Sequence, residues 1–177
     1  MGRVLGTKLL KTDCGAGVGR ISQALLTKEF EHVDLLEPAP HLIQKARENL
    51  VNEGLKCQFY ETGMENFHFQ HKYDVIWIQW VIGHLTDPDL VAFLTRCREN
   101  LSVPSGVIVL KDNVNPSGFY YDTRDNSIAR SSRHLEHLLG LAGLEVCHRT
   151  RYEDFPLICL PVYKLVLRPA ESAPLTD

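Results

Sequence analysis

The run that most constrains the fold is residues 73–80, which read Y-D-V-I-W-I-Q-W. A strand that is apolar at nearly every position is typical of the centre of a parallel sheet, because helices cover both of its faces. Short β-rich runs alternate with helical patterns on either side of this segment, which is the element order of an α/β protein. The sequence therefore predicts an α/β fold with a doubly wound, mostly parallel sheet and an antiparallel edge strand.

The remaining strands are predicted from short β-rich runs bounded by turn residues. A first strand would end at Leu9 and Leu10, although the lysines around it are unfavourable in a central parallel strand, which should be apolar. The last two runs, residues 144–149 and 162–167, are expected to form an antiparallel pair at the edge of the sheet. The other runs lie at residues 33–36, 57–60 and 106–110.

Helices are predicted where apolar residues recur on one face. The clearest begins at Asp87 and Pro88, a favourable N-cap and first helical residue. Residues 112–126, which precede the last helix, are predicted to form a long loop, and loops of that length are often functional. The apolar faces are Ile21, Ala24, Leu25 and Phe30; Leu42, Ile43, Ala46 and Leu50, between Pro40 and Gly54; Leu90, Phe93, Leu94, Cys97 and Leu101; and Leu135, Leu138, Leu139 and Ala142, before Gly143.

The size and charge of the chain indicate one globular domain. A length of 177 residues leaves little room for a second domain, and 44 % hydrophobic with 23 % charged residues is an ordinary globular composition. We predict a single domain over residues 1–168 and a flexible tail over residues 169–177. The net charge of −3 argues against broad nucleic-acid binding, which requires a strongly basic face.

The five cysteines predict neither a zinc site nor a disulfide framework, because they are scattered, odd in number and contain no C-x-x-C pair. We expect reduced, buried thiols in an intracellular, soluble protein. No apolar run approaches the length of a membrane span. The cysteines are Cys14, Cys57, Cys97, Cys147 and Cys159.

A glycine-rich turn at residues 13–20, D-C-G-A-G-V-G-R, follows the first predicted strand. Glycines on alternate positions let the backbone turn tightly and lie close against a ligand. Their spacing differs from the G-x-G-x-x-G of dinucleotide-binding proteins, so a nicotinamide dehydrogenase is the least favoured function. Glu37 ends the second strand, where a carboxylate can accept hydrogen bonds from both hydroxyls of a ribose. The two features together predict a nucleoside site.

Two more groups of side chains follow strands at the same edge of the sheet. Residues 63–65 come after the third strand, so Met64 is placed either beside an adenine or in the core. The strand at residues 73–80 delivers Gln79, Trp80 and His84 to its carboxyl end. An aromatic ring attracts a cation and a histidine takes up a proton near neutrality. Taken alone, Trp80 would be read as a core residue and His84 as a structural histidine.

Three segments resemble the protein α-N-terminal methyltransferases, which methylate the free N-terminus of proteins that begin X-Pro-Lys or X-Pro-Arg. They are residues 13–20, residues 74–87 with the sequence D-V-I-W-I-Q-W-V-I-G-H-L-T-D, and the K-D-N at residues 111–113. The resemblance extends over residues 13–167. It implies a class I, Rossmann-like fold, S-adenosylmethionine as cofactor, and a location in cytoplasm and nucleus.

The resemblance also implies roles for individual residues. Those that bind the cofactor would be Gly15 and Arg20 at its methionine part, Gln79 beside it, Glu37 at the ribose and Met64 at the adenine. Trp80 and Asn113 would line the peptide channel. Asp122, Asp125 and Ser127 match the pattern D-x-x-D-x-S that holds the cationic third residue and the amine of the substrate, and His84 and Asp125 match the proposed general bases.

The chain departs from the family in three places. Glu37 stands where the family usually has aspartate, and Met64-Glu65 where it often has Leu-Gln. Only twelve residues precede Asp13, whereas family members carry several dozen that cover the site. We therefore expect an incomplete first strand and lid region, with the natural start missing or replaced.

Two alternatives to the methylation of protein N-termini stay open at this point. A truncated form of low or no activity could act as an interaction partner of a full-length relative. A class I methyltransferase for a small amine would need no peptide channel. The sequence leaves the physiological substrates, the number of methyl groups added and the oligomeric state undetermined.

Overall fold

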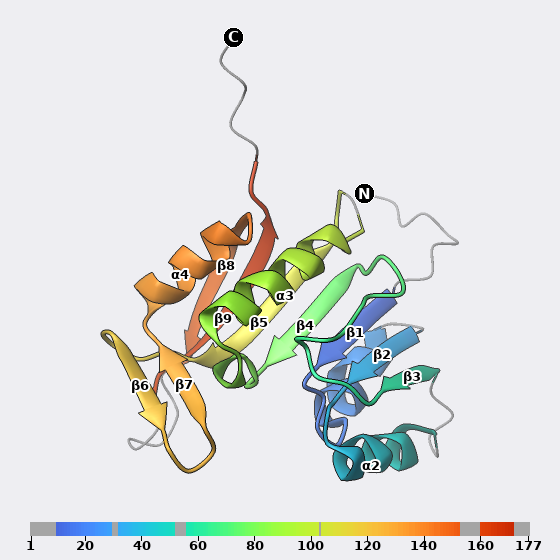
Figure 1. Cartoon of the computed structure of the whole chain (residues 1–177). Helices are drawn as coiled ribbons and strands as arrows, with labels where there is room; N and C mark the ends of the chain where they lie inside the picture. Colours follow the sequence, from blue (N-terminus) through green and yellow to red (C-terminus); the bar gives the residue numbers. More distant parts are fainter. Residues whose placement is uncertain (1–9, 30–31, 52–55, 103, 153–159, 172–177) are drawn as a thin grey trace.

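The computed structural model describes residues 10–29, 32–51, 56–102, 104–152 and 160–171. A seven-stranded sheet has the order β3-β2-β1-β4-β5-β9-β8, and β6 pairs with β7 in a separate hairpin (Figure 1). The strands are β1 (Leu10–Cys14), β2 (His32–Leu36), β3 (Cys57–Tyr60), β4 (Val75–Gln79), β5 (Val107–Asn113), β6 (Phe119–Asp122), β7 (Ser127–Arg130), β8 (Leu144–Tyr152) and β9 (Val162–Pro169). The helices are η1 (Ser22–Leu26), α1 (Thr27–Glu29), α2 (Pro40–Val51), η2 (Ile82–His84), α3 (Asp87–Glu99) and α4 (Ser132–Leu141).

The strands β1 to β5 pair in parallel, as the sequence predicts. The last two runs form the predicted antiparallel pair. The strand that runs against the others is β9, and it lies inside the sheet between β5 and β8 rather than at the edge. The burial of the two strands follows from this order. Val162, Leu165 and Leu167 of β9 are buried, whereas most residues of β8 are not.

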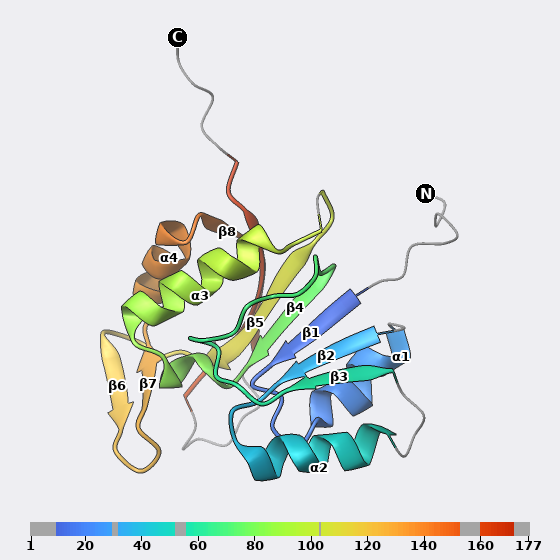
Figure 2. The ribbon, with the colours of Figure 1, turned by 45° about the vertical axis from the view of Figure 1, so that its right-hand side comes forward.

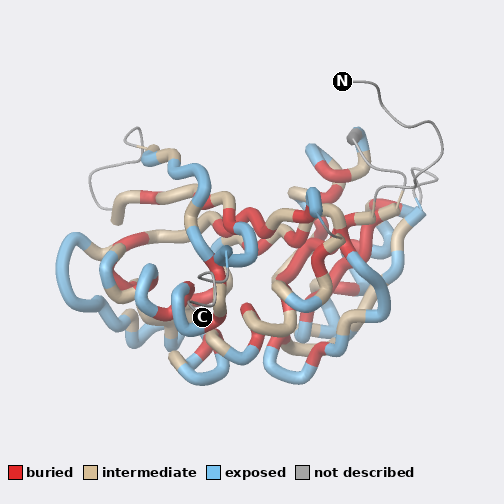
Figure 3. Tube along the Cα trace, turned by 90° about the horizontal axis from the view of Figure 1, so that it is seen from above, coloured by how far each residue is buried: buried red, intermediate tan, exposed pale blue. Residues whose placement is uncertain are grey.

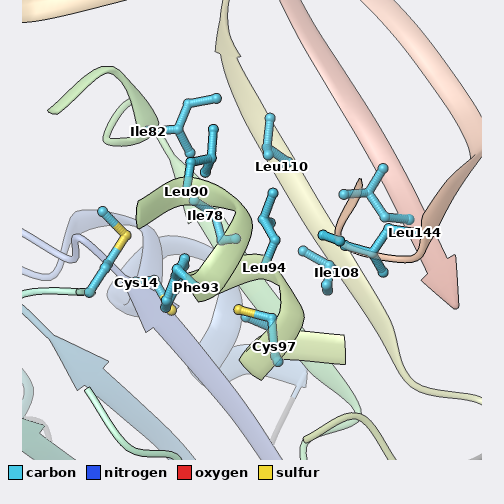
Figure 4. Close-up of a cluster of buried hydrophobic side chains, with 14 of the residues drawn as sticks. Cys14, Ile78, Ile82, Leu90, Phe93, Leu94, Cys97, Ile108, Leu110 and Leu144 are labelled. Atoms are coloured by element: carbon cyan, nitrogen blue, oxygen red, sulfur yellow. The ribbon is translucent and has the colours of Figure 1, made fainter. Parts of the chain in front are cut away.

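Helices cover both faces of the sheet, with α3 and α4 on one face and α2 and η1 on the other (Figures 1 and 2). The buried apolar side chains form two matching clusters. The larger joins α3 and α4 to β4 and β5 and includes Phe93, Leu94, Ile108 and Leu144 (Figure 4). The smaller joins η1 and α2 to β2. Figure 3 shows the buried positions gathered inside the molecule and the exposed ones on its loops and outer helix faces.

The first strand contradicts the prediction that it ends at Leu10. β1 begins there and continues through Lys11, Thr12 and Asp13, all of which are almost fully buried. Polar residues are tolerated because they find partners inside the protein. The hydroxyl of Ser22 donates to the Asp13 carboxylate at 2.7 Å. The position of this strand is therefore decided by its pairing with β2 on one side and β4 on the other, and not by its own apolar content.

Residues 112–126, which were predicted to form a loop, contain regular secondary structure. β5 extends to Asn113, and most of the remainder forms the β6–β7 hairpin. In Figure 1 the hairpin projects at the end of the sheet to which the arrows of β4 and β5 point. The sequence did not predict these strands because they show no alternation of buried and exposed residues. Three consecutive residues of β6 are exposed, namely Phe119, Tyr120 and Tyr121.

The first predicted helix forms the π-helix η1 followed by the short α1, and α3 ends at Glu99, before the predicted Leu101. Its start needs a further correction. The N-cap of α3 is Thr86, whose side chain accepts a hydrogen bond from the Asp89 N–H, and Asp87 is already helical. Ser131 caps α4 in the same way. Gly143 ends that region with a φ of +69°, a conformation that favours glycine. The predicted helix ends at Phe30 and Gly54 lie outside the described residues, and the single-domain assignment stays a prediction.

The cysteines divide by environment. Cys14 and Cys97 are buried, Cys57 is half-buried and Cys147 is exposed, and these four are free thiols. Cys159 lies outside the described residues. Within the described part of the chain, no group of three or more metal-binding side chains comes together, and no helix combines the length and apolar character needed to cross a membrane.

Candidate functional site

The glycine turn lies at the carboxyl end of β1, where ligands of open α/β sheets bind. Gly15, Gly17 and Gly19 all have positive φ, between +55° and +79°. A Cβ atom on Gly15 would lie 2.6 Å from a methyl carbon of Val81, whereas one on Gly17 would meet nothing within 4 Å. Gly15 is therefore required for the close approach of β1 to the chain after β4, and Gly17 faces open space.

Glu37 is tied to this turn. Its two carboxylate oxygens accept hydrogen bonds from the N–H groups of Gly17 and Ala39, each at 3.0 Å. The side chain is nearly buried, but it borders a cavity of about 550 Å³ that Gly15 and Met64 also line. Each carboxylate oxygen can accept more than one hydrogen bond, so Glu37 keeps accepting capacity toward this cavity. We call it the nucleoside cavity.

The loop after β3 closes the far side of the nucleoside cavity. Met64 is buried, and its carbonyl accepts a hydrogen bond of 2.8 Å from the Arg96 guanidinium of α3. The same nitrogen donates to the carbonyl of Glu65 at 3.0 Å. Arg96 therefore fixes the backbone of this loop while the Met64 side chain completes the wall. Sequence reasoning did not identify Arg96, because its partners are backbone groups more than thirty residues away.

A second cavity of about 300 Å³ adjoins the glycine turn on its other side and is lined by Asp13, Arg20 and Gln79 among others. Burial raises the pKa of Asp13 to about 6, although the Ser22 hydroxyl bound to the carboxylate acts in the opposite direction. The Gln79 side-chain oxygen accepts a hydrogen bond from the Trp77 indole at 3.1 Å. Three polar side chains thus line this cavity, which we call the methionine cavity.

Trp80 stands at the junction of the cavities. It follows β4 with a φ of +53°, which is uncommon for a residue other than glycine and marks local strain. Its N–H donates to the Lys111 carbonyl at 2.9 Å. The Lys111 ammonium nitrogen lies 5.0 Å from the centre of the Trp80 ring and 4.8 Å from that of Tyr152, so the lysine lies close to both aromatic rings. Trp80 borders the nucleoside cavity, the methionine cavity and a third one.

The third cavity, of about 350 Å³, lies between the chain after β4 and the β6–β7 hairpin. We call it the acceptor cavity. Its lining includes four of the predicted residues, His84, Asn113, Asp125 and Ser127, in addition to Trp80. His84 also borders the nucleoside cavity. Trp80 and His84 thus separate the two spaces, and a group held in one is next to a group held in the other.

Asp112 supports this arrangement, although sequence reasoning assigned it no role of its own beyond its place in the K-D-N motif and at the start of the predicted loop. One oxygen of its carboxylate accepts hydrogen bonds from the N–H groups of Val81 and Ile82, each at 3.2 Å. The other accepts from the Asn113 N–H at 2.7 Å. Burial raises the pKa of Asp112 to about 6, opposed by these hydrogen bonds and by nearby His84. A polar residue at the end of a buried strand was the available signal for this role.

Arg130 of β7 is a further residue that sequence reasoning missed. Its guanidinium is buried and donates to the carbonyls of Ile82 and Leu85 at 3.1 and 2.6 Å. It also donates to the Asp87 carboxylate at 2.7 Å. These bonds hold the η2 turn, which carries His84, against the hairpin. A Cβ on Gly83 would lie 3.1 Å from the Ile128 carbonyl, so the two segments pack closely.

The structure separates Asp122 from the other predicted residues. Asp122 is absent from the described lining of the three cavities and instead binds Arg124 of its own hairpin. All other predicted site residues border at least one cavity. They are Gly15, Glu37, Met64, Trp80 and His84 at the nucleoside cavity; Gly15, Arg20, Gln79 and Trp80 at the methionine cavity; and Trp80, His84, Asn113, Asp125 and Ser127 at the acceptor cavity.

The chemistry of these cavities fits S-adenosylmethionine. The nucleoside cavity pairs a carboxylate with an apolar wall that includes Leu42 and Met64. The methionine cavity continues from it along the open face of Gly17. Cavities of this size and lining are typical of sites for cofactors.

Comparisons with known proteins agree with this assignment. The chain is 44 % identical over 158 residues to N-terminal Xaa-Pro-Lys N-methyltransferase 1 of Danio rerio, covering 88 % of this chain and 70 % of that protein. It is 39 % identical over 160 residues to α N-terminal protein methyltransferase 1 of Dictyostelium discoideum, covering 89 % of this chain and 59 % of that protein. The chain thus spans roughly three fifths to seven tenths of the length of these relatives.

A solved structure shows the same fold. A SAM-dependent methyltransferase of Leishmania major superposes with a TM-score of 0.85 at 34 % identity, covering 92 % of this chain and 65 % of that one. The model of the family described as AdoMet-dependent proline di-methyltransferase matches residues 3–168. The chain therefore belongs to the family of AdoMet-dependent proline di-methyltransferases, with the class I fold that its sequence predicts.

Proposed function

We propose that this chain transfers methyl groups from S-adenosylmethionine to the free α-amino group of proteins that begin Xaa-Pro-Lys or Xaa-Pro-Arg. The observation that carries the proposal is that Trp80 and His84 border both the nucleoside cavity and the acceptor cavity. An amine in the acceptor cavity would then lie next to the cofactor. The printed name of the Danio rerio relative, a Xaa-Pro-Lys N-methyltransferase, supports the same substrate class.

The cofactor would be held by residues of the two cavities on the glycine-turn side. Glu37 would accept the ribose hydroxyls, and Met64 would pack against the adenine. Gly15 and Arg20 would contact the methionine part, with Gln79 beside it. S-adenosylmethionine supplies a methyl group on a positively charged sulfur. The residues of the protein need only orient the nucleophile for an in-line displacement, so positioning accounts for much of the catalysis.

The acceptor would be held by the residues of the acceptor cavity. The Trp80 ring and the Asn113 amide would position the first two residues of the substrate. Asp125 lines this cavity, and its carboxylate accepts a hydrogen bond from the Ser127 N–H at 3.1 Å, which fixes its orientation. Asp122 and Asp125 would receive the cationic third residue, because carboxylates pair with a cation as it leaves water.

The nucleophile has to be a neutral amine. An α-amino group titrates near pH 7.7–8.0, so roughly a fifth to a third is already deprotonated near pH 7.4. A base then supplies only about 1 kcal/mol, and His84 and Asp125, which line the acceptor cavity, would do this while aligning the amine. A lysine side chain, which titrates near pH 10.4, would need far more help. This difference favours the N-terminus over side-chain amines.

We propose no nucleic-acid partner, because a net charge of −3 does not favour binding to a polyanion. We further propose a cytoplasmic and nuclear location, which imaging of a tagged chain would test. The small-amine and inactive-partner alternatives are not favoured, since the relatives are named as methyltransferases of protein N-termini.

The decisive test is mass spectrometry of a synthetic Ser-Pro-Lys peptide incubated with the purified chain and S-adenosylmethionine. The expected result is the added mass of one or more methyl groups on the peptide with a free N-terminus and none on its N-acetylated twin. The absence of added mass from a folded chain that binds the cofactor would refute the proposal. Equal methylation of both peptides would assign the activity to the lysine side chain.

A further inference from the structure

The two carboxylates expected to receive the cationic residue of the substrate, Asp122 and Asp125, differ in their hydrogen-bond partners. Asp122 is engaged by Arg124, two residues further along the hairpin. The Arg124 Nε and Nη2 atoms donate to the two oxygens of the Asp122 carboxylate at 3.0 and 2.7 Å. The backbone N–H of Arg124 donates to the first of these oxygens as well, at 3.0 Å. The carboxylate therefore already binds a guanidinium in a two-pronged geometry.

Asp125 contrasts with Asp122 although only three residues separate them. Asp125 is exposed, and its carboxylate accepts a hydrogen bond from the backbone N–H of Ser127. It borders the acceptor cavity together with His84. The Asp122 side chain is 18 % exposed, and the Arg124 side chain that covers it is 86 % exposed. The hydrogen bonds from Arg124 lower the pKa of Asp122 to about 2, so this carboxylate is ionised throughout the neutral range.

We infer that Arg124 is a specificity-determining residue that competes with the cationic third residue of the substrate for Asp122. This inference rests on the proposed function. A substrate cation at Asp122 has to compete with the Arg124 guanidinium, which already binds both carboxylate oxygens, whereas Asp125 is open to it. Because Arg124 belongs to the same hairpin turn, it is present at a high effective concentration and reoccupies the carboxylate whenever the substrate leaves.

The competition affects lysine and arginine at the third position differently. A substrate guanidinium can reproduce both hydrogen bonds that the Arg124 side chain makes, whereas the ammonium of lysine acts as a single point charge. Arg124 therefore weakens the binding of Xaa-Pro-Lys peptides more than that of Xaa-Pro-Arg peptides. Since the pair is exposed, the effect is modest, about twofold to fivefold in affinity.

The test compares the parent chain with Arg124→Gln, in the presence of S-adenosylhomocysteine. The dissociation constants of fluorescent Ser-Pro-Lys and Ser-Pro-Arg peptides are measured by anisotropy. We expect Arg124→Gln to bind the lysine peptide about twofold to fivefold more tightly, with a smaller gain for the arginine peptide. Arg168→Gln is the matched control, because Arg168 is exposed and lies six residues along β9 from Val162, toward the opposite end of the sheet.

A second pair of variants separates competition from a general charge effect. If Arg124 acts through Asp122, then the gain from Arg124→Gln disappears when Asp122→Asn is already present. The same gain in that background, or a gain no larger than that of Arg168→Gln, would overturn the inference. The affinities can be read whether or not the peptide is methylated. Failure of the proposed function is recognised separately, as the absence of methylation by the parent chain.

Discussion

The Nε atom of Arg130 lies 2.7 Å from a carboxylate oxygen of Asp87, 43 residues earlier in the chain. The other carboxylate oxygen of Asp87 lies 2.7 Å from the Nε2 atom of His134 on α4. Arg130 also holds the carbonyls of Ile82 and Leu85. One buried guanidinium thus joins the hairpin, the η2 turn and the start of α3. The acceptor cavity depends on this junction, because His84 lies on the turn and Asp125 on the hairpin.

Replacing Arg130 with methionine should lower the free energy of unfolding by about 2–4 kcal/mol, because two carbonyls and a carboxylate lose their partner. The partial exposure of Asp87 to water limits the loss to this range. Urea denaturation at pH 7.5 measures the change. Arg133→Met, at an exposed position of α4, is the control and should change the value little. A loss below 1 kcal/mol for Arg130→Met would contradict the role assigned to this junction.

Replacing Gly15 with alanine should abolish tight cofactor binding. The new Cβ would lie 2.6 Å from Val81 at a backbone φ of +74°, so the glycine turn and the chain after β4 must move apart. We expect the affinity for S-adenosylhomocysteine, measured by calorimetry, to fall at least about tenfold. Gly118→Ala is the matched control, with a similar φ of +61° and nothing within 4 Å of its Cβ. Equal effects of the two substitutions would indicate backbone strain alone.

The raised pKa of Asp112 predicts a pH-dependent contribution to stability. A carboxyl group whose pKa is about 6 in the folded chain and 3.8 in the unfolded chain binds more protons when folded between these values. Its contribution to the free energy of unfolding is therefore greatest below pH 4 and falls as the pH rises through 6. Asp13 behaves in the same way, because its pKa is also raised to about 6.

Asp112→Asn isolates this contribution, since the amide does not ionise. Relative to the parent, the variant should gain stability between pH 4 and pH 7, by at most about 3 kcal/mol. Urea denaturation at several pH values gives the difference, with Glu61→Gln at an exposed position after β3 as the control. A difference between variant and parent that is independent of pH would show that Asp112 does not titrate in this range.

Replacing His84 with glutamine should lower kcat for a Ser-Pro-Lys peptide about fivefold to tenfold at pH 7.4, because the base supplies only about 1 kcal/mol. At pH 9 most of the substrate amine is already neutral, so the deficit should shrink. Steady-state rates at the two pH values measure this, with the exposed His137→Gln as control. A deficit that stays the same at pH 9 would assign His84 to alignment of the amine alone.

Much of the fold follows from the sequence. The apolar run of β4, the alternation of short strands with amphipathic helices and the glycine turn at residues 13–20 each depend on neighbours within one element, so local pattern is sufficient to predict them. The cavity-lining residues that follow strands were predicted for a related reason, whereas Arg20, Asn113, Asp125 and Ser127 were implied by the family resemblance. Gly15, Glu37, Met64 and Trp80 follow successive strands, and the carboxyl ends of parallel strands must meet at one edge.

The tertiary structure alone decided the remaining features. β1 is held by the register of β2 and β4 in spite of its polar residues. β9 lies inside the sheet because it pairs with β5 on one side and β8 on the other. Arg130 and Arg96 bind backbone carbonyls that are distant in sequence. Every residue has such a carbonyl, so the sequence cannot indicate which one an arginine will bind. The physical reason is common to all of them, since pairing between strands and hydrogen bonding to buried carbonyls are determined by which segments become neighbours in the folded chain.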